Sequence, residues 1–136
     1  MNPALKLVIF EQKEVLQELL NLLDKQYDFI LSKDVINLDK IASEMDDISK
    51  KLATIELRRR NLSEGADLKK LIEDSQDNHI KDAYENIKIT LTSIQLQKET
   101  NETLIKQNLF FTHKMLSMIN IPNSTGTYNS YGKMGK

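Results

Sequence analysis

The chain has 136 residues, of which 40% are hydrophobic, 29% are charged and 6% are aromatic, and its formal net charge is −1. This length fits one domain, and so few large apolar residues suit long helices that each bury one stripe. The absence of cysteine excludes disulfides, thiolate metal sites and cysteine nucleophiles. The apolar run near the N-terminus covers only Leu7 to Phe10, too short for a signal sequence or a membrane span. We therefore expect a cytoplasmic protein without membrane insertion.

Charge is distributed unevenly along the chain. All 20 acidic residues lie at or before Glu102, so residues 1–102 carry a net −5 and residues 103–136 carry +4. A mildly basic end suits docking on an acidic partner protein. Four lysines are too sparse for a nucleic-acid footprint, and no nucleic-acid partner is expected.

The residues that break helices are few and far apart. The two prolines are Pro3 and Pro122, and Gly65 is the only glycine before residue 126. The spacing predicts an all-α fold, an elongated antiparallel helical hairpin or three-helix bundle with long coiled-coil-like helices. Residues 1–121 would form the helical domain, and residues 122–136 a flexible C-terminal tail.

The first helix is predicted from about Pro3 to Leu31, with the proline in the first turn. Its apolar residues form two adjacent stripes, which indicates contact with two neighbours. One stripe consists of Leu5, Val8, Val15, Leu19, Leu22 and Phe29, and the other of Ile9, Leu16, Leu20, Leu23, Tyr27 and Ile30.

The second helix is predicted after a break at residues 32–34, with Asp34 as its N-cap, and would end near Leu62. Seven of eight heptad positions are apolar, which is typical of a coiled coil, and Arg59 is the exception. These positions are Leu38, Ile41, Met45, Ile48, Leu52, Ile55, Arg59 and Leu62.

The third long helix is predicted from about Gln76 to Asn120, after a loop at residues 63–67 and a short helix that Asp67 caps. Its expected seam is Ile80, Tyr84, Ile87, Leu91 and Ile94, continued by Asn101, Leu104, Asn108, Phe111, Met115 and Met118. Asn101 and Asn108 are seven residues apart on one face. They either fix the register of the packed helices or bind a partner.

No arrangement of residues suggests catalysis. A glycine-rich phosphate loop and a Glu-x-x-His pair are both missing from the sequence, and His79 and His113 would lie about 50 Å apart on one helix. The basic triplet Arg58–Arg60 suggests phosphate binding, but Glu56 and Arg60 form an i,i+4 pair that explains it more simply. We expect no enzymatic activity, no cofactor and no metal.

The end of the third long helix carries more apolar surface than one seam needs. This helix is longer than the first by about 16 residues, or about 24 Å, so its C-terminal end is predicted to overhang the bundle. Flexible methionine and flat phenylalanine suit a surface that binds another helix. Self-association of two copies through the same patch is the alternative. The predicted binding residues are Ile105, Leu109, Phe110, Thr112, Met115, Leu116 and Ile119.

The order of these parts resembles the FlgN family of flagellar export chaperones. The resemblance covers the whole chain and rests on five degenerate segments. They are Leu-Gln-Glu-Leu-Leu-Asn-Leu-Leu-Asp-Lys-Gln-Tyr at 16–27, Leu-Asp-Lys-Ile at 38–41, Ile-Glu-Leu-Arg-Arg-Arg at 55–60, Asn-Glu-Thr-Leu-Ile at 101–105 and Thr-Tyr-Asn-Ser-Tyr-Gly at 127–132. The stretch at 63–77 is the least similar part.

The resemblance implies a chaperone that holds hook–filament junction proteins of the FlgK and FlgL type by their C-terminal helical regions. It would prevent their premature association and hand them to the export gate. It also implies that a tail tyrosine, Tyr128 or the nearby Tyr131, contacts an export gate protein of the FlhA type. The alternative function is a self-associating coiled-coil scaffold or adaptor without a role in export.

Overall fold

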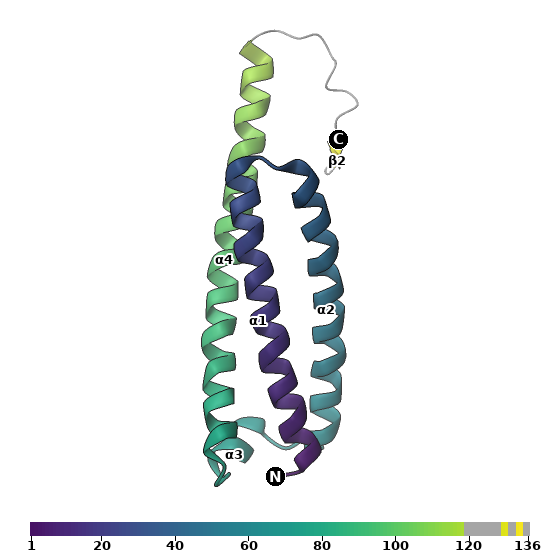
Figure 1. Ribbon diagram of the computed structural model, residues 1–136, viewed down its shortest axis with the longest axis vertical. Coiled ribbons are helices and arrows are strands. Elements are labelled where there is room, and N and C mark those ends of the chain that lie inside the picture. Colours follow the sequence, from purple (N-terminus) through teal and green to yellow (C-terminus); the bar gives the residue numbers. More distant parts are fainter. Residues whose placement is uncertain (119–128, 131–132, 135–136) are drawn as a thin grey trace. The chain divides into compact units, whose positions relative to one another are not determined.

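A computed structural model describes the backbone of residues 1–118, 129–130 and 133–134, and the side chains of residues 1–109 and 114–118. The all-α class is confirmed: the helices are α1 (Pro3–Ser32), α2 (Val35–Ser63), α3 (Leu68–Glu73) and α4 (Asn78–Met118) (Figure 1). The chain divides into two compact units, Met1–Glu102 and Thr103–Lys136, and α4 contributes to both.

The break between α1 and α2 follows from local backbone chemistry, as predicted. Pro3 occupies the first turn of α1, and Lys33 ends that helix in the left-handed region at φ 57°. The Asp34 carboxylate then caps α2 by accepting a hydrogen bond from the Asn37 backbone N–H at 3.2 Å. An acidic cap satisfies an N–H group that the first turn of a helix leaves without a partner.

The connection from α2 to α4 contains the predicted short helix. Glu64 and Gly65 have φ values of 53° and 79°, which end α2, and the Asp67 side chain caps α3 through the Lys69 N–H. A second acidic cap was not predicted. Asp77 Oδ1 accepts a hydrogen bond from the His79 N–H at 2.9 Å, so α4 begins two residues later than the expected Gln76.

Within the first unit, α1 packs against both α2 and α4, as its two stripes predict (Figure 1). Glu11 and Gln12 of α1 contact Arg58 and Glu56 of α2, so these two helices are antiparallel. Lys6 contacts Asp77 and Gln26 contacts Asn101, so α1 and α4 run parallel. One core cluster contains Val8, Val15 and Ile55; the other contains Leu5, Ile9, Leu16, Ile72, Ile80, Ala83 and Ile87.

The predicted seam of α4 in the first unit is wrong at Leu91, which is exposed, whereas Thr90 beside it is buried. Tyr84 is half-buried and packs against the core cluster, but the fully buried residue of that turn is Ala83. The inner positions alternate by three and four residues: Ile80, Ala83, Ile87, Thr90, Ile94, Gln97 and Asn101. Such spacing keeps a helix facing its neighbour over several turns, and it selects small and polar residues here in place of the larger apolar ones.

The second unit contains residues 103–118 of α4 and two short strands. The strands β1 (Asn129–Ser130) and β2 (Lys133–Met134) pair antiparallel, with Asn129 opposite Met134 and Ser130 opposite Lys133. These strands were not predicted, because two residues are too few to show the alternation of apolar and polar residues that indicates a strand. The division at residues 121 and 122 stays a prediction, as does the overhang, which concerns the placement of one unit against the other.

Candidate functional site

The C-terminal part of α4 carries the predicted binding residues. Ile105, Leu109 and Leu116 are half-buried, at spacings that put them on one side of the helix. Met115 and Met118 are more open, with exposed fractions of 49% and 76%. The side chains of Phe110 and Thr112, and the residues Ile119, Tyr128 and Tyr131, lie outside the part that the structure describes.

These residues make an apolar helix surface with basic charge beside it. Lys106 and Lys114 are the charged residues of the segment, and no acidic residue follows Glu102. Methionine adapts its shape because it is unbranched and flexible, so an exposed pair suits helices of varied sequence. The arrangement has the chemistry of a surface for an amphipathic helix with acidic flanks.

Asn101 marks the end of the first unit on α4 and is 1% exposed. Its Nδ2 donates to the Leu23 carbonyl and to Gln26 Oε1, both at 2.9 Å, and its Oδ1 accepts from Gln97 Nε2 at 2.9 Å. This network supports the interpretation that Asn101 fixes the register of α4 on α1. Asn108 is exposed, and for it the choice between register and partner binding stays open.

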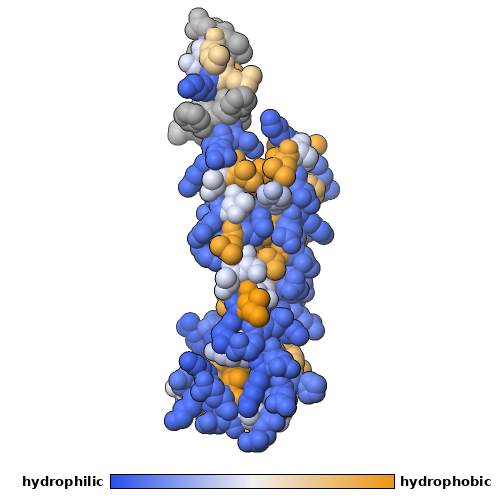
Figure 2. Space-filling view, turned by 90° about the vertical axis from the view of Figure 1, so that its left-hand side faces the viewer, coloured by the Kyte–Doolittle hydropathy of each residue, from blue (hydrophilic) through white to orange (hydrophobic). Residues whose placement is uncertain are grey.

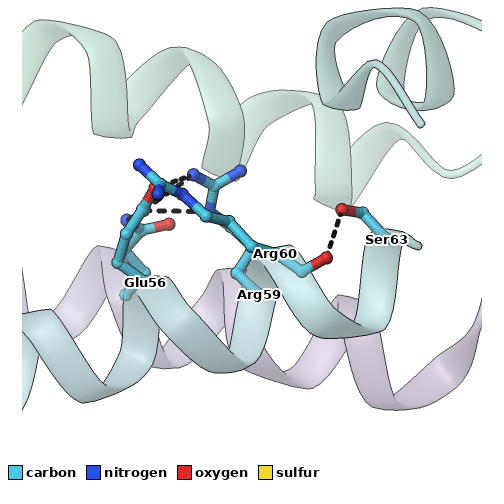
Figure 3. Close-up of polar contacts among 5 residues, drawn as sticks. Glu56, Arg59, Arg60 and Ser63 are labelled. Atoms are coloured by element: carbon cyan, nitrogen blue, oxygen red, sulfur yellow. Dashed lines mark hydrogen bonds and ion pairs between the residues drawn. The ribbon is translucent and has the colours of Figure 1, made fainter. Parts of the chain in front are cut away.

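The basic triplet is engaged within the chain. Arg59 and Arg60 both contact Glu56 (Figure 3). Arg59 Nη2 lies 2.6 Å and Arg60 Nε 2.9 Å from Glu56 Oε2, and Arg58 Nη1 donates to Glu11 Oε1 at 2.7 Å. The pKa of Glu56 is lowered, mainly by the hydrogen bonds from Arg59 and less by the contact with Arg60. Partial burial of the carboxylate opposes this shift. The predicted Glu56–Arg60 pair is confirmed, and the structure adds the Arg59 contact.

A second apolar surface lies on the outer side of α4 in the first unit, and the sequence analysis missed it. Ile89 and Leu96 are seven residues apart and 65% and 61% exposed. The face that carries α4 shows apolar side chains among hydrophilic ones (Figure 2). The sequence does contain a signal for this surface, because Ile89 and Leu96 repeat the seven-residue spacing of Ile87 and Ile94 two residues further along the helix.

The described residues hold no group of three or more His, Asp or Glu side chains placed to bind a metal ion. No described helix has a stretch long and apolar enough to cross a bilayer.

A family model described as FlgN protein matches residues 1–136, the whole chain. No curated protein and no solved structure matches it.

Proposed function

Because the chain belongs to the FlgN family and is a flagellar export chaperone, we propose that its clients are hook–filament junction proteins of the FlgK and FlgL type. The chaperone binds the C-terminal helical region of such a client in the cytoplasm, prevents its premature association and delivers it to the export gate. The apolar side of α4 at Ile105, Leu109 and Leu116, flanked by exposed methionines, is the observation that supports this site. No catalytic step and no cofactor belong to the proposal.

The proposed mechanism is burial of a surface that is apolar in both partners. A client helix that packs only in the finished filament exposes an apolar face while it waits for export. Covering a few hundred Å2 of it contributes several kcal/mol at about 25 cal/mol per Å2. Association and side-chain ordering cost part of that gain, so binding near the micromolar range is expected.

A double variant that introduces two charges tests this site. Leu109→Glu combined with Leu116→Lys puts two unpaired charges into the contact, and a client peptide should bind at least about a hundredfold more weakly. Both new residues are good helix formers, so the circular dichroism spectrum should be unchanged. The measurement is calorimetric titration with a peptide of the C-terminal helix of a junction protein.

The control is Ile89→Glu combined with Leu96→Lys, which has the same charges at the same spacing on an exposed part of the same helix. This control should bind like the unmodified chain. Loss of binding in the control alone would place the client on the outer side of α4 in the first unit. Full binding by the folded Leu109/Leu116 variant would show that the proposed site is wrong.

Contact with the export gate is assigned to the tail tyrosines, Tyr128 and Tyr131. We expect Tyr128→Ala to weaken capture of the cytoplasmic domain of an FlhA-type protein more than Tyr131→Ala does. Deleting residues 123–136 should abolish that capture and leave client binding and thermal unfolding nearly unchanged. A deletion that lowers the helical content would contradict this division of labour.

The alternative function is a self-associating coiled-coil scaffold or adaptor without a role in export, favoured by the exposed Met115 and Met118. Stoichiometry separates the two functions. A chaperone forms a defined complex with one client helix, whereas a scaffold forms homo-oligomers that the client peptide leaves intact. Light scattering with and without the peptide distinguishes them.

A further inference from the structure

The contact between α1 and α4 changes character along its length. Near α3, the inner positions of α4 are apolar: Ile80, Ala83 and Ile87 belong to one core cluster with Leu5, Ile9 and Leu16 of α1. Further along, three of the next four inner positions are polar. These four are Thr90, Ile94, Gln97 and Asn101.

The same stretch of α4 is also a weak helix by composition. Residues 89–97 contain no charged residue, so no ion pair between successive turns stabilises them. Isoleucine, threonine and serine, which form helices poorly, fill five of these nine positions. Thr92 and Thr100 donate their hydroxyl hydrogens to the carbonyls of Lys88 and Leu96, a bond that slightly destabilises helices.

The α1 face that meets this stretch is apolar. Ile9, Leu16, Leu23 and Ile30 follow one another at seven-residue intervals, and all are buried. Ile9 and Leu16 pack on the apolar start of α4, whereas the Leu23 carbonyl accepts a hydrogen bond from Asn101. The C-terminal half of α1 is therefore covered in part by polar side chains of α4, whose hydrogen bonds water can replace.

We propose that residues 90–102 of α4 form an opening segment, which leaves α1 as a unit while residues 78–87 stay packed. The hydrogen bonds of Asn101 act as its latch. When the segment opens, water takes the place of these hydrogen bonds, and Ile94 is the one inner apolar residue of α4 that leaves the core cluster. Separating residues 78–87 from α1 would instead expose the buried Ile80 and Ile87. Opening uncovers the face of α1 around Leu23 and so provides an apolar helix surface that is hidden in the closed state.

Opening is measured by thiol labelling, which the cysteine-free chain makes clean. Leu23→Cys and Ile9→Cys each place one thiol at a buried position of the same helix and the same heptad series. In the full chain under native conditions, Leu23→Cys should react at least about tenfold faster than Ile9→Cys. Its rate should depend weakly on low urea concentrations, because little surface is exposed by a local opening.

The latch is tested by adding Asn101→Ala to both cysteine variants, because alanine removes the hydrogen bonds to Leu23 and Gln26. Loss of the latch should speed the labelling of Leu23→Cys several-fold and change that of Ile9→Cys much less. Equal rates with equal urea dependence at both positions would show that the chain opens only as a whole. A fast reaction at Leu23→Cys that Asn101→Ala leaves unchanged would equally overturn the proposal, because the opening would then not involve the Asn101 contact. These outcomes do not depend on the identity of the client.

Discussion

The two sides of α1 are built differently. The side that packs on α2 combines Val8 and Val15 with Ile55, and its edge is closed by ionic contacts such as Glu11–Arg58 at 2.7 Å. The side that packs on α4 begins with a larger apolar cluster and ends in the amide network of Asn101. Apolar contact supplies affinity between helices without direction, whereas hydrogen bonds require one alignment.

This difference explains how the unit fixes its register. A coiled-coil face with apolar residues at every heptad position tolerates a slip of one heptad, because the same kind of side chain returns. Asn101 removes that freedom on the α4 side, since a slip would leave its buried amide without Leu23 and Gln26. The α2 side needs no such device, because the short turn at residues 33–34 already sets how α2 lies on α1.

The largest expected effect is at the apolar end. Ile80 is 0% exposed in the cluster that joins α1, α3 and α4, so Ile80→Ala should lower the free energy of unfolding by about 2–5 kcal/mol. Ile89→Ala, on the exposed side of the same helix, is the control and should cost about 1 kcal/mol or less. Urea unfolding followed by circular dichroism measures both, and similar losses would mean that α4 does not use this seam.

The sequence predicts the helices well because their ends depend on neighbouring residues. Asp34 and Asp67 are caps whose carboxylates act within three residues, and both are confirmed. Asp77 is the same kind of signal, because its carboxylate accepts from the His79 N–H two residues on, but it was missed, since nothing in the sequence sets it apart from the nearby Asp74. Its second contact, with Lys6, joins α1 to the start of α4 over 71 residues of sequence and has no local signal.

The seam of α4 was predicted less well, because some of its buried residues have small or polar side chains. Leu91 is a large apolar residue and was placed inward, but it is exposed, and the buried neighbour is Thr90. Apolar periodicity weights bulky residues, whereas close packing of α4 on α1 admits alanine, threonine and amides. Asn101 and Asn108 were both candidates for fixing the register or binding a partner, and the structure shows the first role for Asn101, which is buried and bonded to α1.

The candidate binding site could be predicted only in part, because the sequence of one chain carries no information about the shape and charge of its client. Half-burial of Leu109 and Leu116 and exposure of Met118 describe an apolar helix, but client choice depends on the shape and charge of the client. The site residues therefore stay predictions.

A smaller effect is expected at the amide network. Asn101→Ala removes a buried hydrogen bond to the Leu23 carbonyl and the shared partner of the half-buried Gln26 and Gln97, and it should cost about 1–3 kcal/mol of stability. The exposed Asn61→Ala on α2 is the control and should stay within about 0.5 kcal/mol of the unmodified chain. Urea melts decide the matter, and a cost at Asn101 no larger than at Asn61 would mean that the α4 side has no polar lock.

The smallest effect is expected at the edge of the α2 side, and pH reveals it. Glu56 accepts hydrogen bonds from Arg59 and Arg60, and Glu56→Gln should lower stability by up to about 1 kcal/mol at neutral pH. The hydrogen bonds from Arg59 lower the pKa of Glu56 in the folded chain, so as the solution is acidified the unfolded chain takes up the proton first, near its ordinary pKa of about 4.3. The stabilisation is thus complete above that value and is lost as the pH falls through the folded pKa.

Urea melts of Glu56→Gln and the unmodified chain should differ most at neutral pH and converge in acid, whereas Glu44→Gln reports the general effect of removing an exposed acid from α2. A gap between Glu56→Gln and the unmodified chain that persists unchanged in acid would show that the arginines do not stabilise the ionised carboxylate.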